Sequence, residues 1–504
     1  MAPFQLLPIT RQDMAAHPSF YVASAIVAPL CLYTLAIIAY NIFFHPLRHC
    51  PGPLLGRATI WYWIYFSLRG ETHRLTEFLH AEYGDIVRVS PNRLSFIVET
   101  AWKDIYMHKQ GRPQFQKVAG QRPSHGAYSI MTAPDDAHAR QRKMLSHAFS
   151  SKALMEQEPL LKTYVDMLVA IVRDYARQNR AIDMVAYFEY TTFDIIGDLC
   201  FHESFHNLEE RRAHAWLGLL RYSFKAGPLL LALQNLPFSE TFLRGIRRRA
   251  APKRVQMVQQ GRDRVTKRLA EGEGRPDFMT RILPHLREDG TGISRAELDL
   301  TMLALVVAGA ETTATTLSGC LYHLTQNPHV LKKLQDEVRT TFPGCESINM
   351  LGVSRLPYLL AVIEETLRVY PPIAIDLPRR TPPEGAAICG QWVPGGVVVG
   401  VPHYTAYSSP HNFTKPDAFL PERWLQNRDE KFENDKRDVF EPFSAGPRNC
   451  LGKNLAYAEM KLVLASLVYN FDFEIVERDD NWEDQKVYTI FDKKPLGILF
   501  KERD

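Results

Sequence analysis

Residues 443–452 read Phe443-Ser-Ala-Gly446-Pro-Arg448-Asn-Cys450-Leu-Gly452. The two glycines allow tight turns and a close approach of the backbone to a ligand, and the loop leads into an amphipathic helical pattern over 454–468. A thiol at the start of a helix is stabilised as a thiolate by free amides and by the helix dipole. Cys450 therefore fits three roles: an inert buried thiol, a nucleophile whose base comes from elsewhere, or a lone thiolate ligand to a metal, with Arg448 nearby to pair an anionic group.

The rest of the composition offers no second site of that kind. The 504 residues include 7 scattered cysteines without a Cys-x-x-Cys pair, which excludes a disulfide scaffold and a zinc ribbon. A hydrophobic content of 46% excludes intrinsic disorder, and a net charge of +4 gives no footprint for nucleic acid. No linker, repeat or low-complexity tract divides the body, so one large catalytic domain is predicted.

A long helix is predicted from the capping box Ser294-Arg-Ala-Glu297 to Asn327-Pro328. In its middle stands Ala308-Gly309-Ala310-Glu311-Thr312. A glycine inside a helix costs about 1 kcal/mol relative to alanine, so this segment needs a reason. Two stay open: tight helix packing, with the Thr312 hydroxyl bonded to a carbonyl of the preceding turn, or a flat, bulky group lying against this face.

Helical patterns dominate from residue 135 to residue 370, and a second well-marked helix begins at Pro357. It carries Glu365 and Arg368 on one face, and their apolar flanks favour a buried pair. Short strands are predicted at 85–90, 94–98, 396–401, 487–491 and 497–500, the first two as a hairpin. The fold class is therefore mainly α with small β-sheets (α+β).

The amino-terminal region has no charged residue between Asp13 and Arg48. Its apolar run from Phe20 to Phe44 exceeds the ~20 residues of a spanning helix and the length of a signal-peptide core, which favours a membrane anchor over a cleaved leader. The basic residues that follow predict a cytosolic body, and the prolines of HPLRHCPGP predict a stiff, extended hinge. We expect an anchor over 1–45, a Pro-rich hinge over 46–57 and a catalytic domain over 58–504.

Together these features resemble the cytochrome P-450 monooxygenases. The loop around Cys450 matches the haem-binding signature Phe-x-x-Gly-x-Arg-x-Cys-x-Gly at every position. The segment that ends in Glu311-Thr312 is similar to the oxygen-activating part of the family's long central helix. The resemblance covers essentially the whole chain and implies the P-450 fold with a single N-terminal transmembrane helix.

Two further motifs carry the resemblance. Glu365-Thr-Leu-Arg368 matches the Glu-x-x-Arg pair of the family, and Pro421-Glu-Arg423-Trp424 matches the segment whose arginine completes that network. The anchor, the hinge and the run ETTATTLSG most resemble fungal microsomal members that hydroxylate secondary metabolites.

The resemblance implies haem b (iron protoporphyrin IX) with Cys450 as the thiolate ligand of its iron. It implies that Glu311 and Thr312 deliver protons during oxygen activation. The other cofactor-binding residues that it implies are Phe443, Gly446, Gly452 and Ala308 around the haem, and His138, Arg142, Arg379 and Arg448 at its propionates.

His138 departs from the family pattern, which often has tryptophan four residues before the arginine. Because an imidazole N–H can donate as an indole N–H does, His138 and Arg142 still form a candidate pair on one helix face. The alternative is that the run HARQRK is an exposed, solvated surface.

The reaction implied is insertion of one oxygen atom from O2 into an apolar small molecule, a polyketide, terpenoid or alkaloid secondary metabolite, at the endoplasmic reticulum membrane. No flavin or nicotinamide fingerprint follows a strand, so NADPH-cytochrome P-450 reductase is the implied electron donor and cytochrome b5 a candidate second one. Two alternatives stay open: a haem-thiolate dehydratase or isomerase without O2, and a non-catalytic haem carrier or sensor. Asp376, polar within an apolar stretch, either meets a polar group of the substrate or bonds to local backbone.

Overall fold

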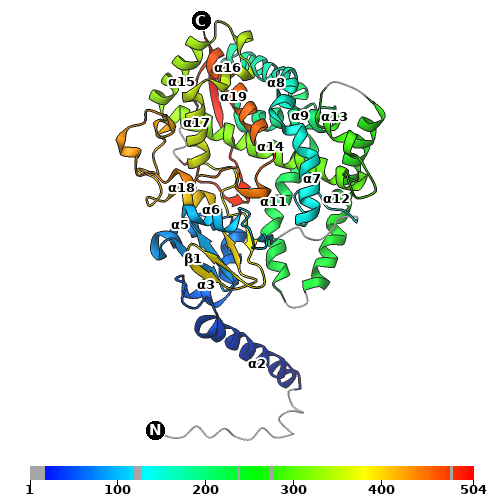
Figure 1. The fold of residues 1–504 in the computed structure, drawn as a ribbon, viewed down its shortest axis with the longest axis vertical. Coiled ribbons are helices and arrows are strands. Elements are labelled where there is room, and N and C mark those ends of the chain that lie inside the picture. Colours follow the sequence, from blue (N-terminus) through cyan, green and yellow to red (C-terminus); the bar gives the residue numbers. More distant parts are fainter. Residues whose placement is uncertain (1–17, 119–125, 237–238, 273–275, 477–480, 504) are drawn as a thin grey trace.

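Helices form most of the body between residues 135 and 370, as the sequence predicts (Figure 1). The computed structural model describes residues 18–118, 126–236, 239–272, 276–476 and 481–503. Its first helices are α2 (Pro18–Ala39), α3 (Leu54–Ala58), α4 (Trp61–Arg69), α5 (Thr72–Tyr83), α6 (Glu99–Ile105), α7 (Asp135–Leu145), α8 (Ser151–Arg177), α9 (Met184–Phe201) and α10 (Asn207–Glu210). Then follow α11 (Ala215–Gln234), α12 (Ser239–Ala270), α13 (Phe278–Ile282), α14 (Arg295–Gln326), α15 (Pro328–Thr341), α16 (Met350–Ser354), α17 (Pro357–Val369), α18 (His403–Ser408) and α19 (Lys453–Asn470).

Small sheets complete the described part of the chain. The largest has the strand order β1-β2-β8-β5-β3 and consists of β1 (Ile86–Ser90), β2 (Arg93–Phe96), β8 (Val398–Gly400), β5 (Arg379–Arg380) and β3 (Gln116–Lys117). β1 pairs antiparallel with β2, which confirms the predicted hairpin. The other sheets are β4 (Ile182–Asp183) with β12 (Gly497–Glu502) and β9 (Phe471–Ile475), β6 (Ala386–Ile388) with β7 (Gln391–Val393), and β10 (Val487–Tyr488) with β11 (Ile490–Phe491). The predicted fold class, mainly α with small sheets, is confirmed.

Helix α14 crosses the middle of the body (Figure 1). Its predicted capping box is present, because Ser294 accepts from the Glu297 amide while Glu297 accepts from the Ser294 amide. α14 packs most extensively against α9 and also against α17 and α19. At Gly309 the approach to α9 is so close that a Cβ atom would lie 2.9 Å from the Cδ1 atom of Ile196. Tight helix packing therefore accounts for this glycine.

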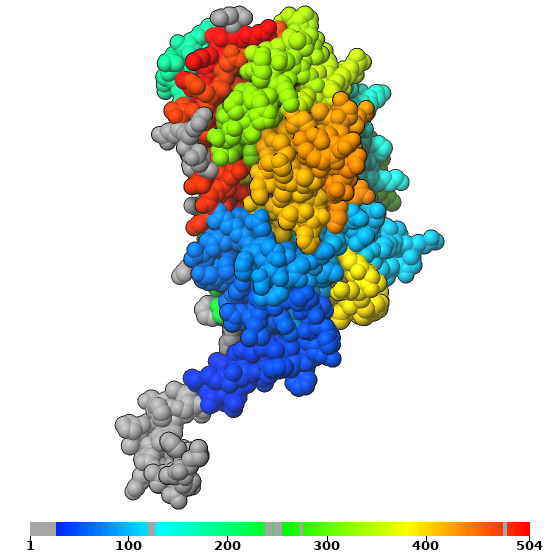
Figure 2. Space-filling model, turned by 90° about the vertical axis from the view of Figure 1, so that its left-hand side faces the viewer, coloured from blue at the N-terminus to red at the C-terminus, as the bar shows by residue number. Residues whose placement is uncertain are grey.

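Helix α2 continues as a π-helical turn, Tyr40–Phe44, and projects from the body (Figures 1 and 2). The segment Val27–Phe44 is long and apolar enough to cross a membrane, and only 6% of it is buried. α14 meets the same length and hydropathy criteria, but it is 67% buried and belongs to the core. An apolar, unburied helix near the amino terminus is compatible with the predicted anchor.

The segment 46–57 is packed onto the body rather than running free. The Arg88 amide of β1 donates to the Pro51 carbonyl at 2.7 Å, and a Cβ atom at Gly52 would collide with the Arg88 carbonyl oxygen. The predicted extended path is wrong for residues 46–49, which form turns in which the Arg48 amide donates to the His45 carbonyl at 2.9 Å and the Cys50 amide donates to the Leu47 carbonyl at 3.1 Å. Only residues 51–53 lie outside turns and helices before α3 begins at Leu54. The hinge function and the domain boundaries stay predictions.

Candidate active site

The loop that carries Cys450 is held by its own backbone. The Cys450 amide donates to the Phe443 carbonyl at 2.8 Å, and the Asn449 amide donates to the Gly446 carbonyl at 3.0 Å. Within the loop, residues Gly446–Arg448 form a 3-10 turn. Helix α19 begins directly after Gly452. The backbone thus fixes one thiol at the amino end of a helix, as the sequence predicts.

The two glycines of this loop do different things. Gly446 has φ +75°, and a Cβ atom there would collide with the carbonyl oxygen of Tyr106. Gly452 has φ −85°, and the nearest atom to a Cβ atom would be the Cys450 Sγ at 4.0 Å. The turn therefore requires Gly446, whereas Gly452 keeps the space beside the thiol clear.

The Cys450 side chain is exposed on one side, yet protein atoms surround most of its sulfur. Burial raises its pKa, although the Gly452 amide, Arg142 and Lys453 act in the opposite direction. A coordinating metal ion removes the proton of such a thiol outright. Among the described residues no group of three or more histidine, cysteine, aspartate or glutamate side chains could hold a metal ion. Cys450 thus offers a single thiolate as a metal ligand.

Four cations gather beside this loop: Lys117, Arg142, Arg379 and Arg448. Arg142 Nη1 donates to the carbonyl of Asn449, next to Cys450, at 2.6 Å. Arg448 Nη2 donates to Asp135 Oδ1 at 2.7 Å, while its Nη1 is buried without a hydrogen-bond partner in the structure. Asp135 is the one carboxylate bonded to these cations among the described residues. The cluster thus keeps an excess of positive charge.

His138 lies in the same cluster and is 6% exposed. Burial, and then the charges of Arg448, Lys117 and Arg142, lower its pKa to about 4. His138 is therefore a neutral imidazole at pH 7, with one N–H to donate. His138 is therefore not part of an exposed, solvated surface. Its contact with a propionate stays a prediction.

Lys117 was not predicted from the sequence. It lies on β3, opposite Arg379 of β5, and its Nζ donates to the Met131 carbonyl at 3.0 Å. Burial, Arg379 and Arg448 together lower the pKa of Lys117 to about 8. A two-residue strand inside a long loop gives no periodic signal, so only the sheet pairing reveals this lysine.

The face of α14 that carries Ala308 and Thr312 is open, although most of the helix is buried. Ala308 is exposed and Thr312 is half-buried. The Thr312 Oγ1 donates to the Ala308 carbonyl at 2.8 Å, which is the local bond that the sequence left open. Glu311 points elsewhere: it is 1% exposed, and Lys493 Nζ donates to its Oε2 at 2.7 Å. The two predicted proton-transfer residues therefore diverge from their shared helix.

Behind the loop, Glu365 is the centre of a fully buried ion network. Arg368 donates to both Glu365 oxygens, at 2.8 and 3.0 Å, and Arg423 Nε donates to Glu365 Oε1 at 3.1 Å. Trp424 Nε1 adds a bond of 2.8 Å, and Arg423 Nη1 reaches Asp435. Burial alone would raise the pKa of Glu365, but Arg368 and Arg423 outweigh it and lower that pKa. The network joins α17 to the 3-10 turn Pro421–Trp424.

A family model described as Cytochrome P450 matches residues 51–500. The chain belongs to the cytochrome P450 family. It is 43% identical over 474 residues to cytochrome P450 monooxygenase astA of Talaromyces wortmannii, which covers 94% of this chain and 95% of that protein. It is 43% identical over 479 residues to cytochrome P450 monooxygenase efuB of Hormonema carpetanum, with the same coverage. Versicolorin B desaturase of Aspergillus parasiticus is 39% identical over 477 residues, again 94% and 95% of the two chains. This protein is a cytochrome P450 monooxygenase.

Membership in the cytochrome P450 family implies a haem with a thiolate ligand, and the residues described above fit that group. Cys450 would bind the iron. The two propionates, with a charge of −2, match a cluster of four cations and one carboxylate, whose sum is +3. The unpartnered Arg448 Nη1 is a donor of the kind that a propionate would use.

Asp376 has a partner within the protein. Arg93 Nη2 lies 2.6 and 2.7 Å from its two oxygens, and the same guanidinium stacks over the Trp63 ring at 4.4 Å. The buried carboxylate of this P450 is thus satisfied by a salt bridge, which neither of the two sequence-based interpretations anticipated.

Proposed function

We propose that this cytochrome P450 inserts one oxygen atom of O2 into an apolar small molecule, a polyketide, terpenoid or alkaloid, with electrons from NADPH delivered by a reductase. The observation that carries the proposal is the backbone-held loop that presents the Cys450 thiol beside a cluster with an excess of positive charge. Relatives of about 40% identity named cytochrome P450 monooxygenase support the reaction class.

The haem, when bound through Cys450, supplies the activation of O2. The chain supplies its surroundings. Arg142, Arg379 and Arg448, with His138 and Lys117, would hold the propionates and so fix the plane of the group against the loop. Gly452 leaves room beside the thiol. The Thr312 hydroxyl would exchange its bond to the Ala308 carbonyl for a bond toward the reacting centre, and Glu311 would resupply the proton.

The substrate side of the proposal rests on the open face of α14. Ala304, Leu305, Val307 and Ala308 are partly or fully exposed there although they are small or apolar. Such a lining excludes water and accepts an apolar ligand. Because Versicolorin B desaturase is among the relatives, removal of hydrogen from the substrate is a second outcome that the same site could produce.

Location and partners follow from the amino-terminal helix. We propose that α2 anchors the protein in the endoplasmic reticulum membrane, with the body in the cytosol beside NADPH-cytochrome P450 reductase and, as a second donor, cytochrome b5. The exposed apolar surface of α2 supports this location.

The deciding experiment is co-expression with the reductase in microsomes, incubation with a fungal metabolite library under ¹⁸O₂, and mass spectrometry of the products. A product that gains one labelled oxygen only when both NADPH and O2 are present supports the proposal. Turnover without either reagent would indicate the dehydratase or isomerase alternative, and haem binding without turnover the carrier alternative. Cys450→Ala should abolish the red-shifted Soret band of the reduced, CO-bound protein, and an unchanged band would refute Cys450 as the ligand.

A further inference from the structure

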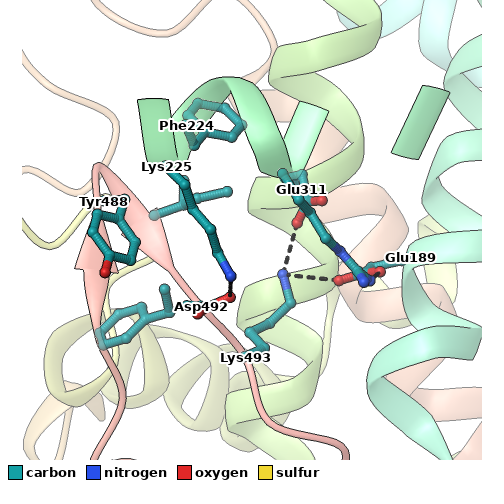
Figure 3. A pocket seen from close by; sticks show the side chains of 10 residues that line it. Glu189, Phe224, Lys225, Glu311, Tyr488, Asp492 and Lys493 are labelled. Carbon is teal, nitrogen blue, oxygen red and sulfur yellow. Dashed lines mark hydrogen bonds and ion pairs between the residues drawn. The ribbon is translucent and has the colours of Figure 1, made fainter. Parts of the chain in front are cut away.

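A buried lysine from the carboxyl-terminal part of the chain holds Glu311. Lys493 lies between β11 and β12, and its Nζ donates to Glu311 Oε2 at 2.7 Å and to Thr315 Oγ1 at 3.0 Å. The same nitrogen lies 3.2 Å from Oε1 of Glu189 on α9. Figure 3 shows Lys493 reaching up between the two carboxylates. The ammonium thus makes two hydrogen bonds and a further ion pair within the protein.

The three charged groups are almost completely removed from solvent: the side chains of Lys493, Glu311 and Glu189 are 3%, 1% and 1% exposed. A buried charge is tolerated only when it is paired. Arg221 of α11 supplies the second cation and pairs with Glu189. Burial nevertheless raises the pKa of Glu189, against Lys493 and with the help of Glu311. The neutral form of this carboxyl group is therefore favoured more than in a glutamate exposed to water.

Glu311 is not saturated by these contacts. Its Oε1 is buried and has no hydrogen-bond partner in the structure. A buried carboxylate oxygen without a partner is costly, and a bound water is the usual way to satisfy it. The free Oε1 is therefore the atom at which a water chain would end.

A cavity of about 40 Å³ is lined by Glu311 together with Glu189, Lys493 and Arg221, and by aromatic and aliphatic side chains of α11 and of the segment 488–491. It has room for water and offers the two to four polar partners that a buried water needs. Toward the surface it is bordered by the ion pair Lys225–Asp492, with Nζ to Oδ1 at 2.8 Å, whose side chains are 50% and 36% exposed (Figure 3). Arg221 is also 50% exposed. The cavity thus leads from solvent to Glu311.

We propose that this cavity is the proton inlet of the enzyme, and that Lys493 is the positioning residue that keeps the Glu311 carboxylate at its inner end. The inference deepens the proposed function, because it rests on Glu311 as the residue that resupplies protons. The two faces of α14 then have separate tasks: Thr312 faces the open side, and Glu311 faces the supply of water.

The proton balance is simple. Monooxygenation releases one oxygen atom of O2 as water, so protons are consumed in each turnover. Each proton enters as hydronium, binds to Glu311 Oε1, and weakens the ion pair to Lys493 because the carboxyl group becomes neutral. The released carboxylic acid passes the proton to the Thr312 side and returns to Lys493 as a carboxylate. Lys493 keeps its own proton throughout, and no electron moves in these steps.

The test compares Lys493→Met with Lys494→Met, a matched control on the same segment whose Nζ donates to the Asn481 carbonyl at 3.0 Å. In Lys493→Met we expect product formed per NADPH oxidised to fall by about tenfold, with peroxide rising in its place and with a larger solvent deuterium isotope effect on product formation. Lys494→Met should match the wild type. The reduced CO spectrum should be unchanged in both variants.

A readout that does not depend on turnover is infrared spectroscopy of the resting protein. Without Lys493, two adjacent buried carboxylates cannot both stay ionised, so Lys493→Met should gain a carboxylic-acid C=O band. That band should be absent from Lys493→Met/Glu189→Gln/Glu311→Gln. Its absence from Lys493→Met itself would count against the proposal.

Removal of a buried cation can also prevent folding. In that case Lys493→Arg, which keeps the charge, should retain most of the coupling, and Glu189→Gln should lower it by about threefold because the second carboxyl group of the inlet is lost. Wild-type coupling and isotope effect in folded Lys493→Met, or in Glu189→Gln if Lys493→Met does not fold, would overturn the inlet. Wild-type coupling in Glu311→Gln would instead overturn the role of Glu311 in the proposed function.

Discussion

Lys117 and Arg379 stand directly opposite each other on the antiparallel strands β3 and β5. Like charges in directly opposed positions destabilise a sheet, and Arg448 adds a third cation nearby. Such a cluster is retained when an anionic group lies between its members. The two propionates of the haem implied by the family are anions of that kind, and the pairing of β3 with β5 would bring Lys117 to them.

Lys117→Met should therefore weaken retention of the haem. One of the cations beside the propionates is lost, and we expect transfer of haem to apomyoglobin to become about tenfold faster, which corresponds to about 1.4 kcal/mol. Lys332→Met is the control, because Lys332 forms an exposed pair with Asp336 on α15. Equal transfer rates for the two variants would show that Lys117 does not contact the cofactor.

The two glycines of the cysteine loop should respond differently to alanine. Gly446→Ala combines a left-handed φ with a collision against the Tyr106 carbonyl, so we expect a loss of about 3 kcal/mol of folding free energy or more and little folded protein. Gly452→Ala meets only the Cys450 sulfur at 4.0 Å, so its thermal unfolding should stay near that of the wild type while the Soret band shifts. If both variants unfold alike, the separation of their roles is wrong.

Local patterns explain why much of this site could be predicted from the sequence. The capping box needs only Ser294 and Glu297 three residues apart, and Glu365 and Arg368 meet because they are one helical turn apart. The Cys450 loop is likewise contiguous. For each of these, chain geometry over a few residues dictates the contact.

The remaining parts depend on contacts between distant segments. Lys493 lies in a loop, and lysines are rarely buried in proteins. The packing of the carboxyl-terminal segment against α9 and α14 is what buries this one. Glu311 and Thr312 are adjacent in sequence, and the family resemblance implies one shared role for them, the delivery of protons. The helix nevertheless directs their side chains to different surroundings. Tertiary packing, which no local pattern encodes, separates their surroundings.

Thr312→Ala should leave the spectrum of the reduced, CO-bound protein intact and lower product formed per NADPH by about tenfold, because the hydroxyl that we propose to pass the proton is lost. Thr316→Ala is a matched control: Thr316 makes the same type of bond one turn later, Oγ1 to the Thr312 carbonyl at 3.1 Å, and is buried. Coupling that falls equally in both variants would mean that helix stability, rather than proton transfer, is affected.

Glu297 predicts a pH dependence of stability. Burial acts to raise its pKa, but bonds from Arg140, the Ser294 amide and Gln141 lower it to about 2. Because the folded pKa lies below the unfolded value of about 4.3, the stabilisation is complete above that value and is lost as the pH falls toward 2. Glu297→Gln should therefore destabilise the protein by about 2 kcal/mol at pH 7.

Thermal unfolding at pH 7, 5 and ~3 measures this difference, since pH ~3 lies between the folded and unfolded pKa values. The variant should melt several degrees below the wild type at the two higher values, and the gap should narrow at the lowest. A gap that stays constant with pH would assign the effect to lost packing at the start of α14 and not to the charge of Glu297.

The buried pair Arg423–Asp435 allows the ion network to be tested by a double-mutant cycle. Both side chains are fully buried, and Arg423 also binds Glu365. Arg423→Met leaves two carboxylates without this partner, so we expect a loss of about 3–5 kcal/mol. Asp435→Asn alone removes one of the two negative charges that Arg423 pairs with, so its loss of unfolding free energy should be smaller. In the double variant, position 435 carries no charge that needs Arg423 as a partner. The double variant's loss of unfolding free energy, measured by chemical unfolding, should therefore be at least ~1 kcal/mol smaller than the sum of the two single losses. A difference of this size is about the coupling expected of contacting residues. Strict additivity would show that Arg423 acts through Glu365 alone and that Asp435 lies outside the network.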